Sequence, residues 1–475
     1  MENIKFGPDG WCSLIADQFT VGNIARAARA ISRWLVGKHK ENTPSVVIGY
    51  DTRFGGPMFA ETMAKIFAVG GIKVFLSDRF ATSPMVSLGT VRKKASMGII
   101  ISASNKAFMY SGIKLKGHFG GPLADTDLRN IENMVPEFSE VHLESIHFDE
   151  YIDKKIIEYI DLEELYINHV RNNIDLDLIA RSDFSFAFDA MFGSGQQIMK
   201  KLLPGVRSLH CEQDFAFGGK SPEPDFSNLR EFSTLIKKDG KLDCGLAVDG
   251  DACRAAMLDV NGNYVDANNI MLLLIHYLHK YKGHEGKVVA GFSATSMIEK
   301  LCGNYALPVR RVRSGFRDIC NIMLKEKVLV GGEETGGISV ISHIPDRDGI
   351  WAGLLIWQFM AETGKSLREL LDEVHDITGF FAFERVELAV EKNRKNAIIE
   401  KCRNGFFGRF GDRVVERVET LEGFKFLFTN GEWLLIRPSG AISGLKMYAE
   451  STSSESCLEI LKDAREAVLG AVPLE

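Results

Sequence analysis

Ser104 and Lys114 are the first pair of side chains whose types and spacing suggest chemistry. Residues 99–102 have β-forming side chains and run into a small, polar segment, which is typical of a buried strand ending in an exposed loop. Ser104 follows that strand end, where ligands of open α/β sheets collect, and Lys114 lies on a second short strand. A serine nucleophile beside a mobile cation suits phosphoryl transfer, whereas an isolated serine would be only a small turn residue.

A second set of reactive side chains follows the apolar residues 245–248. Asp249 and Asp251 alternate on a tight loop, and Cys253 and Arg254 come directly after them. Two converging carboxylates supply the hard oxygen ligands that Mg²⁺ requires. The pattern therefore favours a Mg²⁺ site. The alternatives are an acidic turn with solvated side chains and an aspartyl-phosphate phosphatase of the haloacid dehalogenase type.

Two further loops have groups that bind sugars and anions. Residues 331–337 place Glu333 and Thr335 between glycine pairs, where a carboxylate and a hydroxyl can bind vicinal sugar hydroxyls. The alternative for this loop is a hairpin with surface glutamates. Residues 433–446 predict a strand that leads into an anion nest of backbone N–H groups. The candidate anion ligands there are Arg437, Ser439 and Gly440.

The elements that must position these loops alternate between strands and helices. We expect strands at 45–50, 73–76, 184–188, 245–248 and 287–291, and helices at 21–35, 58–69, 157–173 and 268–280. This alternation predicts three α/β/α domains with mixed, mostly parallel sheets, followed by a smaller C-terminal α+β domain. The expected boundaries are 1–150 with the serine loop, 151–262 with the metal loop, 263–378 with the sugar loop and 379–475 with the phosphate loop.

Composition excludes several classes of function. The chain of 475 residues is 45% hydrophobic and 25% charged, as in ordinary globular proteins, and it can bury several cores. A net charge of −6 gives no basic footprint for nucleic acid. No stretch reaches the roughly 18 apolar residues of a membrane span, and the N-terminus has no signal-peptide pattern. The 8 cysteines are scattered, so we expect reduced thiols in a cytoplasmic protein without membrane partners.

The loop motifs together resemble those of the α-D-phosphohexomutases, the phosphoglucomutase and phosphomannomutase enzymes. The family loop T-A-S-H-N-P reads S-A-S-N-K-A at 102–107, and D-G-D-x-D-R reads D-G-D-A-C-R at 249–254. The sugar motif G-E-E-S-G reads G-E-E-T-G at 332–336. The phosphate clamp R-P-S-G-T-E-P-x-x-R reads R-P-S-G-A-I-S-G-L-K at 437–446. The resemblance covers essentially the whole chain, in the family's order.

The resemblance implies four domains around a central cleft and a reversible transfer between the 1- and 6-positions of a hexose phosphate, through a hexose 1,6-bisphosphate intermediate. Ser104 would carry the phosphoryl group and, with Asp249 and Asp251, hold Mg²⁺. Lys114 and Arg254 would stabilise charge or move protons. The sugar phosphate would be held by Arg313, Glu333, Thr335, Arg437, Ser439, Gly440 and Lys446. Glucose, mannose and amino sugars share the hydroxyls concerned.

Departures from the family pattern fall in the motifs that handle phosphate or metal. They are Cys12, Asn105, Lys106, Cys253, Ala441 and Ile442. Two hypotheses follow. The first is a phosphohexomutase with a weakened metal site, in which Lys106 partly replaces the missing histidine as a local cation. The second is a catalytically impaired paralogue that binds sugar phosphate or acts as a structural or regulatory partner.

Overall fold

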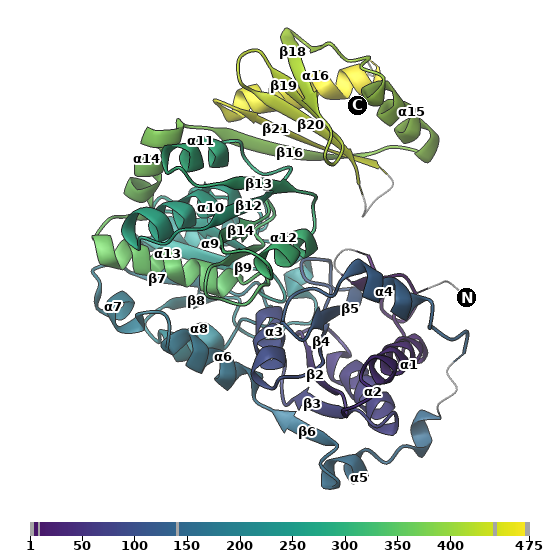
Figure 1. Cartoon of the computed structure of the whole chain (residues 1–475). Coiled ribbons are helices and arrows are strands. Elements are labelled where there is room, and N and C mark those ends of the chain that lie inside the picture. Colours follow the sequence, from purple (N-terminus) through teal and green to yellow (C-terminus); the bar gives the residue numbers. More distant parts are fainter. Residues whose placement is uncertain (1–3, 8–9, 139–141, 440–443, 471–475) are drawn as a thin grey trace. The chain divides into compact units, whose positions relative to one another are not determined.

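The computed structural model describes residues 4–7, 10–138, 142–439 and 444–470 (Figure 1). The chain divides into two compact units, one made of residues 1–288 and 315–371 and the other of residues 289–314 and 372–475. Within the described ranges, no helix combines the length and apolar character needed to cross a bilayer.

The first sheet has six strands in the order β1-β5-β4-β2-β3-β6. Its strands are β1 (Trp11–Leu14), β2 (Ser45–Tyr50), β3 (Lys73–Ser77), β4 (Met97–Ile101), β5 (Tyr110–Gly117) and β6 (Ile157–Ile160). β4, β2, β3 and β6 run parallel, whereas β5 is antiparallel to both β4 and β1. Because β2 and β4 are parallel neighbours, the loops after them leave the sheet at the same edge.

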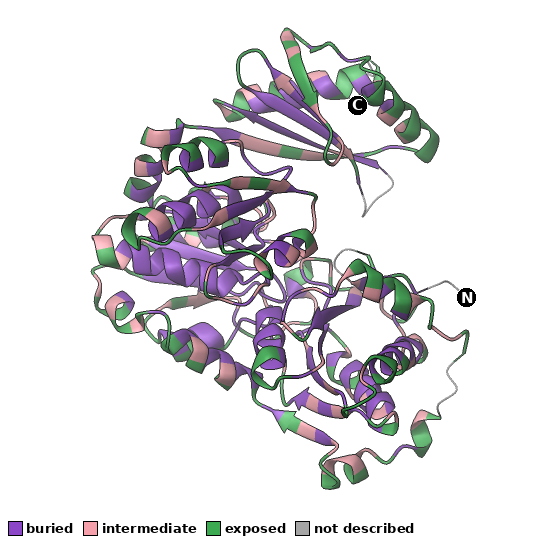
Figure 2. Ribbon diagram, in the orientation of Figure 1, coloured by how far each residue is buried: buried purple, intermediate pink, exposed green. Residues whose placement is uncertain are grey.

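Helices cover both faces of this sheet, as the period-2 pattern of its strands requires. Val46 and Ile48 of β2 belong to the core formed with α1 (Val21–Lys38) and α2 (Gly56–Val69). Gly49 lies against Val86 of α3 (Ser83–Arg92) on the opposite face, where a Cβ on Gly49 would be 2.5 Å from the Val86 side chain. In Figure 2, α3 is coloured as buried over most of its length.

Residues 157–173 differ from the predicted amphipathic helix. Residues 157–160 form β6, which pairs parallel with β3, and the helix α6 (Leu162–Arg171) begins only after the N-cap Asp161. The Asp161 side chain accepts a hydrogen bond from Glu164 N, which fixes that start. Tertiary pairing with β3 thus prevails over the helical pattern in the first four residues.

The second sheet has five strands in the order β11-β10-β9-β7-β8. They are β7 (Phe186–Asp189), β8 (Arg207–Leu209), β9 (Cys244–Val248), β10 (Ala255–Leu258) and β11 (Tyr264–Val265). β8, β7 and β9 run parallel to one another, whereas β10 is antiparallel to both β9 and β11. The sequence predicted mostly parallel sheets, but parallel pairs are not the majority in this one. Phe232 and Ile236 of α9 (Arg230–Asp239) pack on this sheet.

The third sheet has the order β13-β12-β14-β15 and ends in an antiparallel hairpin of β14 and β15. Its elements are β12 (Lys287–Gly291), β13 (Val309–Val312), β14 (Val328–Gly332), β15 (Ile338–Val340), α10 (Ala267–His276), α11 (Met297–Asn304) and α12 (Phe316–Met323). The long buried helix α13 (Gly349–Thr363) contacts β9, β10 and β15. The remaining elements up to residue 378 are α4 (Asp125–Glu132), η1 (Leu143–Ser145), α5 (Phe148–Asp153), α7 (Leu176–Arg181), α8 (Ile198–Leu202), η2 (Phe217–Gly219), η3 (Tyr277–Tyr281) and α14 (Leu367–Thr378).

The C-terminal sheet has the order β16-β21-β20-β19-β18-β17, and its strands from β16 to β18 pair antiparallel with their neighbours. Its elements are β16 (Ala382–Ala389), β17 (Arg409–Phe410), β18 (Arg413–Glu419), β19 (Phe424–Phe428), β20 (Trp433–Pro438), β21 (Gly444–Ser451), α15 (Lys392–Arg403) and α16 (Ser454–Leu469). Leu434 and Ile436 share a core with α15 and α16, while Trp433 and Leu435 pack in a separate cluster with Phe292. The predicted fold of three α/β/α domains with mixed sheets and a smaller C-terminal α+β domain is confirmed.

Candidate active site

The loop after β4 holds Ser104 in a strained backbone conformation. Ser104 is buried and has φ 53°, a left-handed value that residues with a Cβ rarely adopt. Its N–H donates to Ser102 Oγ at 2.9 Å. Strain of this kind costs on the order of 1–3 kcal/mol and persists only where the surroundings fix the backbone.

Arg53 supplies that restraint. It lies just after β2, is fully buried and pairs with Asp51 Oδ2 at 3.0 Å. The rest of the guanidinium donates to four backbone carbonyl oxygens of the serine loop, those of Ser104, Lys106, Ala107 and Tyr110, at 2.7–3.0 Å. The sequence motifs gave Arg53 no place in the site. The signal available was that it follows the expected strand 45–50, at the kind of strand end where ligands of α/β sheets collect.

The loop after β9 contacts the serine loop through a hydrogen bond and through a close backbone approach at Gly250. Asp249 Oδ2 accepts from Ser104 Oγ at 2.5 Å, and Asp249 Oδ1 accepts from Arg254 N at 2.9 Å. Both Ser104 and Asp249 are buried. A Cβ on Gly250 would lie 2.7 Å from the Ser104 carbonyl oxygen, so the two backbones touch where Gly250 has no side chain. Two sheets thus bring their strand-end loops into direct contact.

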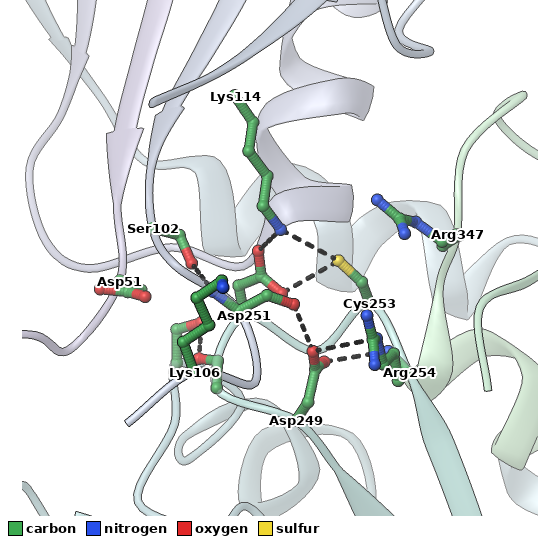
Figure 3. Close-up of polar contacts among 12 residues, drawn as sticks. Asp51, Ser102, Lys106, Lys114, Asp249, Asp251, Cys253, Arg254 and Arg347 are labelled. Carbon is green, nitrogen blue, oxygen red and sulfur yellow. Dashed lines mark hydrogen bonds and ion pairs between the residues drawn. The ribbon is translucent and has the colours of Figure 1, made fainter. Parts of the chain in front are cut away.

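Lys114 reaches the same point from β5. Its Nζ donates to Asp251 Oδ2 at 2.5 Å and lies 3.8 Å from Cys253 Sγ, as Figure 3 shows. The Cys253 thiol donates to Asp251 Oδ1 at 2.9 Å. Lys114, Asp251 and Cys253 are all buried. Lys114, one of the predicted catalytic cations, therefore forms an ion pair with one of the two carboxylates predicted to bind the metal.

The Lys114 ammonium separates the pKa values of the two buried carboxylates. Desolvation and the charge of Asp251 raise the pKa of Asp249 to about 6, although Arg254 and Lys114 oppose the shift. Burial alone would also raise the pKa of Asp251, but the Lys114 ammonium holds it below its ordinary value. Burial, followed by the Asp251 charge, raises the pKa of Cys253, which keeps this side chain a thiol in the absence of a metal.

The donor set of this loop fits a divalent cation. One ligand atom each from Asp249, Asp251 and Cys253 lies within 4.8 Å of the others, and all three residues are buried. In a tetrahedral site with metal–oxygen and metal–sulfur bonds of about 2.0 and 2.3 Å, the ligand atoms lie about 3.3–3.5 Å apart, so the three donors must move closer together on binding. The two carboxylates suit Mg²⁺, whereas the sulfur suits softer ions.

The sugar loop lies beside the metal loop. Ala255 N donates to Gly336 O at 3.2 Å, and Arg254 forms an isolated β-bridge with Gly337. Glu333 is buried rather than exposed on the surface. Its Oε1 accepts a hydrogen bond from Gly315 N at 2.7 Å. Thr335 is half-buried. The first unit therefore gathers Ser104, Lys114, Asp249, Asp251, Arg254, Glu333 and Thr335 on three neighbouring loops and one strand.

The remaining predicted ligands belong to the second unit. Arg437 Nη1 donates to Glu422 Oε1 at 2.8 Å and Nη2 to the Tyr448 hydroxyl at 2.7 Å. Lys446 Nζ pairs with Glu387 Oε1 at 2.5 Å. Both cations of the predicted phosphate clamp thus already have carboxylate partners. Ser439 is buried and Arg313 is exposed, while Gly440, Ala441 and Ile442 lie outside the described residues.

Segment 345–349 links several parts of the first unit. Asp346 accepts from Lys116 Nζ and from Ser87 Oγ. Asp348 accepts from the Tyr166 hydroxyl at 2.9 Å and contacts His343 Nε2 at 2.9 Å. These contacts tie β5, α3 and α6 to the start of α13.

His343 continues this network to the protein surface. Its ring stacks on Trp351 and on His169, and its Nδ1 lies 3.2 Å from His169 Nε2. Arg92 approaches the far nitrogen of His169 at 3.3 Å. Burial, followed by the charges of His343 and Arg92, lowers the pKa of His169 from 6.5 to about 4.

Comparison with known proteins identifies three successive matches. The α/β/α domains I, II and III of phosphoglucomutase/phosphomannomutase match residues 3–141, 164–262 and 266–377. A phosphoglucomutase/phosphomannomutase of Thermococcus kodakarensis is 26% identical, with 96% of each chain covered. A phosphoglucosamine mutase of Methanococcus maripaludis is 28% identical, with 89% of this chain and 91% of that protein covered. The crystal structure of a Thermus thermophilus protein assigned as a phosphomannomutase is 29% identical, with a TM-score of 0.86 and coverage of 99% and 100%.

Proposed function

We propose, from the premise that the chain belongs to the phosphoglucomutase/phosphomannomutase family, that it interconverts hexose 1-phosphate and hexose 6-phosphate through a phosphoserine at Ser104. The sugar phosphate would pass through a hexose 1,6-bisphosphate that reorients between two half-reactions. The substrate class is consistent with the relatives, which are named for phosphorylated glucose, mannose and glucosamine.

The 2.5 Å hydrogen bond from Ser104 Oγ to Asp249 Oδ2 carries this proposal. A hydroxyl held on a buried carboxylate has a proton acceptor in place when its oxygen attacks phosphorus. In that step the Ser104 Oγ–P bond forms as the P–O bond of the sugar phosphate breaks. In the reverse step the sugar hydroxyl takes the phosphoryl group and Ser104 recovers its proton.

Catalysis of phosphoryl transfer depends mainly on stabilising the negative charge of the transferring phosphoryl group. Lys114 on β5 and Arg254 on the metal loop supply two cations, and each already contacts one of the carboxylates. A divalent ion held by Asp249, Asp251 and the serine oxygen would neutralise further charge on the phosphoryl oxygens. Fixed charges in a buried site act strongly because little water screens them.

The proposed substrate ligands form two groups. Glu333 and Thr335 offer a carboxylate and a hydroxyl on the hairpin loop beside Arg254, a composition suited to vicinal sugar hydroxyls. The distal phosphate would be held by Arg437, Ser439, Gly440 and Lys446, and Arg313 would also contact the substrate.

One observation favours the second candidate, a catalytically impaired sugar-phosphate binder. The carboxylates of Glu422 and Glu387 neutralise Arg437 and Lys446, so a phosphate must compete with internal partners for both cations. A weakened clamp lowers the time that a bisphosphate intermediate remains bound, and retention of that intermediate is required for a mutase.

The test is intact-protein mass spectrometry of the full chain after incubation with glucose 1,6-bisphosphate, in separate samples with Mg²⁺, Mn²⁺ and Zn²⁺. We expect one added phosphate that maps to Ser104, is lost on addition of hexose 1-phosphate, and is absent from Ser104→Ala. Ser102→Ala is the matched control and should still be phosphorylated. A chain that binds sugar phosphate but stays unmodified with every metal would establish the non-catalytic binder instead.

A further inference from the structure

Cys253 is the one donor of the metal loop that the proposed reaction does not use. It sits two residues after Asp251, is buried, and has its sulfur 2.9 Å from Asp251 Oδ1. Its side chain therefore points toward the carboxylates and not into an apolar core. In Figure 3 the sulfur points toward the Asp251 carboxylate and the Lys114 amine.

The charge around this sulfur suits a bound thiolate. The Asp249 and Asp251 carboxylates face the Lys114 ammonium, at 2.5 Å from Asp251, and Arg254, at 3.9 Å from Asp249, and Arg254 also pairs with Glu223. With Arg254 and Glu223 offsetting each other, a divalent ion and Lys114 carry three positive charges against two carboxylates, and a Cys253 thiolate would supply the third negative charge. Burial makes such an imbalance costly, because water does not screen it.

The donor types decide between ions. Mg²⁺ demands oxygen ligands in near-octahedral geometry and gains little from sulfur, whereas Zn²⁺ and similar borderline ions take mixed carboxylate and thiolate ligands at four-coordinate sites. Two carboxylates, one sulfur and the nearby Ser104 oxygen make a mixed set of four, and Ser104 Oγ already contacts Asp249. This composition departs from an all-oxygen magnesium site.

We propose that Asp249, Asp251 and Cys253 bind a borderline divalent cation of the Zn²⁺ class, with Cys253 as a thiolate ligand, in preference to Mg²⁺. This inference rests on the proposed function, since it names the metal class of the same site. On binding, the sulfur–metal bond replaces the S–H bond, and the thiol proton leaves to solvent.

The experiment uses the full chain after removal of metals with a chelator. Co²⁺ is titrated as a spectroscopic substitute for Zn²⁺, and the near-ultraviolet sulfur-to-cobalt charge-transfer absorption is recorded. We expect this absorption to saturate at one equivalent, to disappear on addition of Zn²⁺ and to survive an excess of Mg²⁺. Cys253→Ser should abolish it and weaken Zn²⁺ binding by at least about 10-fold, the lower bound for loss of even an outer-shell partner.

Cys244→Ser is the matched control, because Cys244 is a buried thiol at the start of β9, the strand whose far end leads into the metal loop. It should retain the absorption. Cys253→Asp should lose it and bind Mg²⁺ more tightly than the parent chain. The inference is overturned if the parent shows no such absorption, if Cys253→Ser retains it, or if Mg²⁺ displaces Co²⁺ at equal concentration.

These measurements need no turnover, so their outcome is independent of the phosphorylation test. Phosphorylation of Ser104 in Mg²⁺ without any sulfur-to-cobalt absorption would uphold the proposed function and remove this inference. The absorption in a chain that is never phosphorylated would do the reverse.

Discussion

Arg53 holds Ser104 by its backbone, with guanidinium Nη2 donating to the Ser104 carbonyl oxygen at 2.7 Å. The same guanidinium binds three further carbonyl groups of that loop and the Asp51 carboxylate. The side chain of the proposed nucleophile is thus placed by a residue that never touches it. This relationship explains how a serine with φ 53° persists at the end of β4.

Replacement of Arg53 should therefore disorder the serine loop. We expect Arg53→Met to lower the free energy of unfolding by about 3–5 kcal/mol, because it leaves the buried Asp51 charge without its partner. Urea unfolding measures this loss, and the rate of Ser104 phosphorylation should fall with it. Arg181→Met is the control, since its pair with Asp177 is exposed and should contribute only about 0–1 kcal/mol. Equal losses in both variants would contradict the assignment.

Contact between the serine and metal loops requires a glycine at position 250. In Gly250→Ala the new Cβ would lie 2.7 Å from the Ser104 carbonyl oxygen, so one loop must move away from the other. We expect a stability loss of about 1–3 kcal/mol, as for other overpacked sites, and slower Ser104 phosphorylation. Gly205→Ala places its Cβ in open space and should leave both quantities unchanged. Normal phosphorylation of Gly250→Ala would show that the loops need not touch.

Lys114 should act through its charge. We expect Lys114→Met to slow phosphorylation of Ser104 by about 10²–10³-fold, the effect typical of losing one preorganised electrostatic group. Rapid-quench measurement with glucose 1,6-bisphosphate gives the rate. Lys114→Arg keeps the positive charge beside Asp251 and should recover part of the loss. A methionine variant as fast as the parent would remove Lys114 from the catalytic group.

Glu422 should limit phosphate binding at Arg437. Its carboxylate accepts from Arg437 Nη1 and from Ser314 N, so an incoming phosphate must replace it at the guanidinium. Glu422→Gln should tighten binding of hexose 6-phosphate by up to about 10-fold, or ~1.4 kcal/mol, in isothermal titration calorimetry. Glu416→Gln removes an exposed carboxylate on β18 and should leave the affinity unchanged. Weaker binding in Glu422→Gln would mean that the carboxylate positions Arg437 instead.

The histidine network should make stability depend on pH. Burial lowers the pKa of His169 from 6.5 to about 4, so at this group the unfolded chain binds more protons between these values. The contribution of His169 to stability should therefore fall as the pH is lowered from about 6.5 toward 4, opposite in sign to that of Asp249, whose pKa is raised to about 6. In His169→Gln this part of the dependence should disappear, which urea midpoints measured across the range will reveal. An unchanged slope would place the dependence on other groups.

Much of the site was predictable because its residues follow apolar strands. The runs before Ser104 and Asp249 mark β4 and β9, and strand ends of α/β sheets are where ligands collect. Lys114 was also predicted to lie on a second strand, and in the structure that strand is β5. Residues 157–160 show the limit of this reasoning, since a helical pattern there gave way to pairing with β3.

The sequence by itself determined the fold class and the chemical character of the loops, because apolar periodicity and residue type are local properties. Only the tertiary structure decided that Ser104 donates a hydrogen bond to Asp249, which lies 145 positions away in the chain. The same holds for the hydrogen bonds from Arg53 to the serine loop and from Arg437 to Glu422. Such contacts depend on how separate sheets and loops pack against each other, and no local pattern encodes that packing.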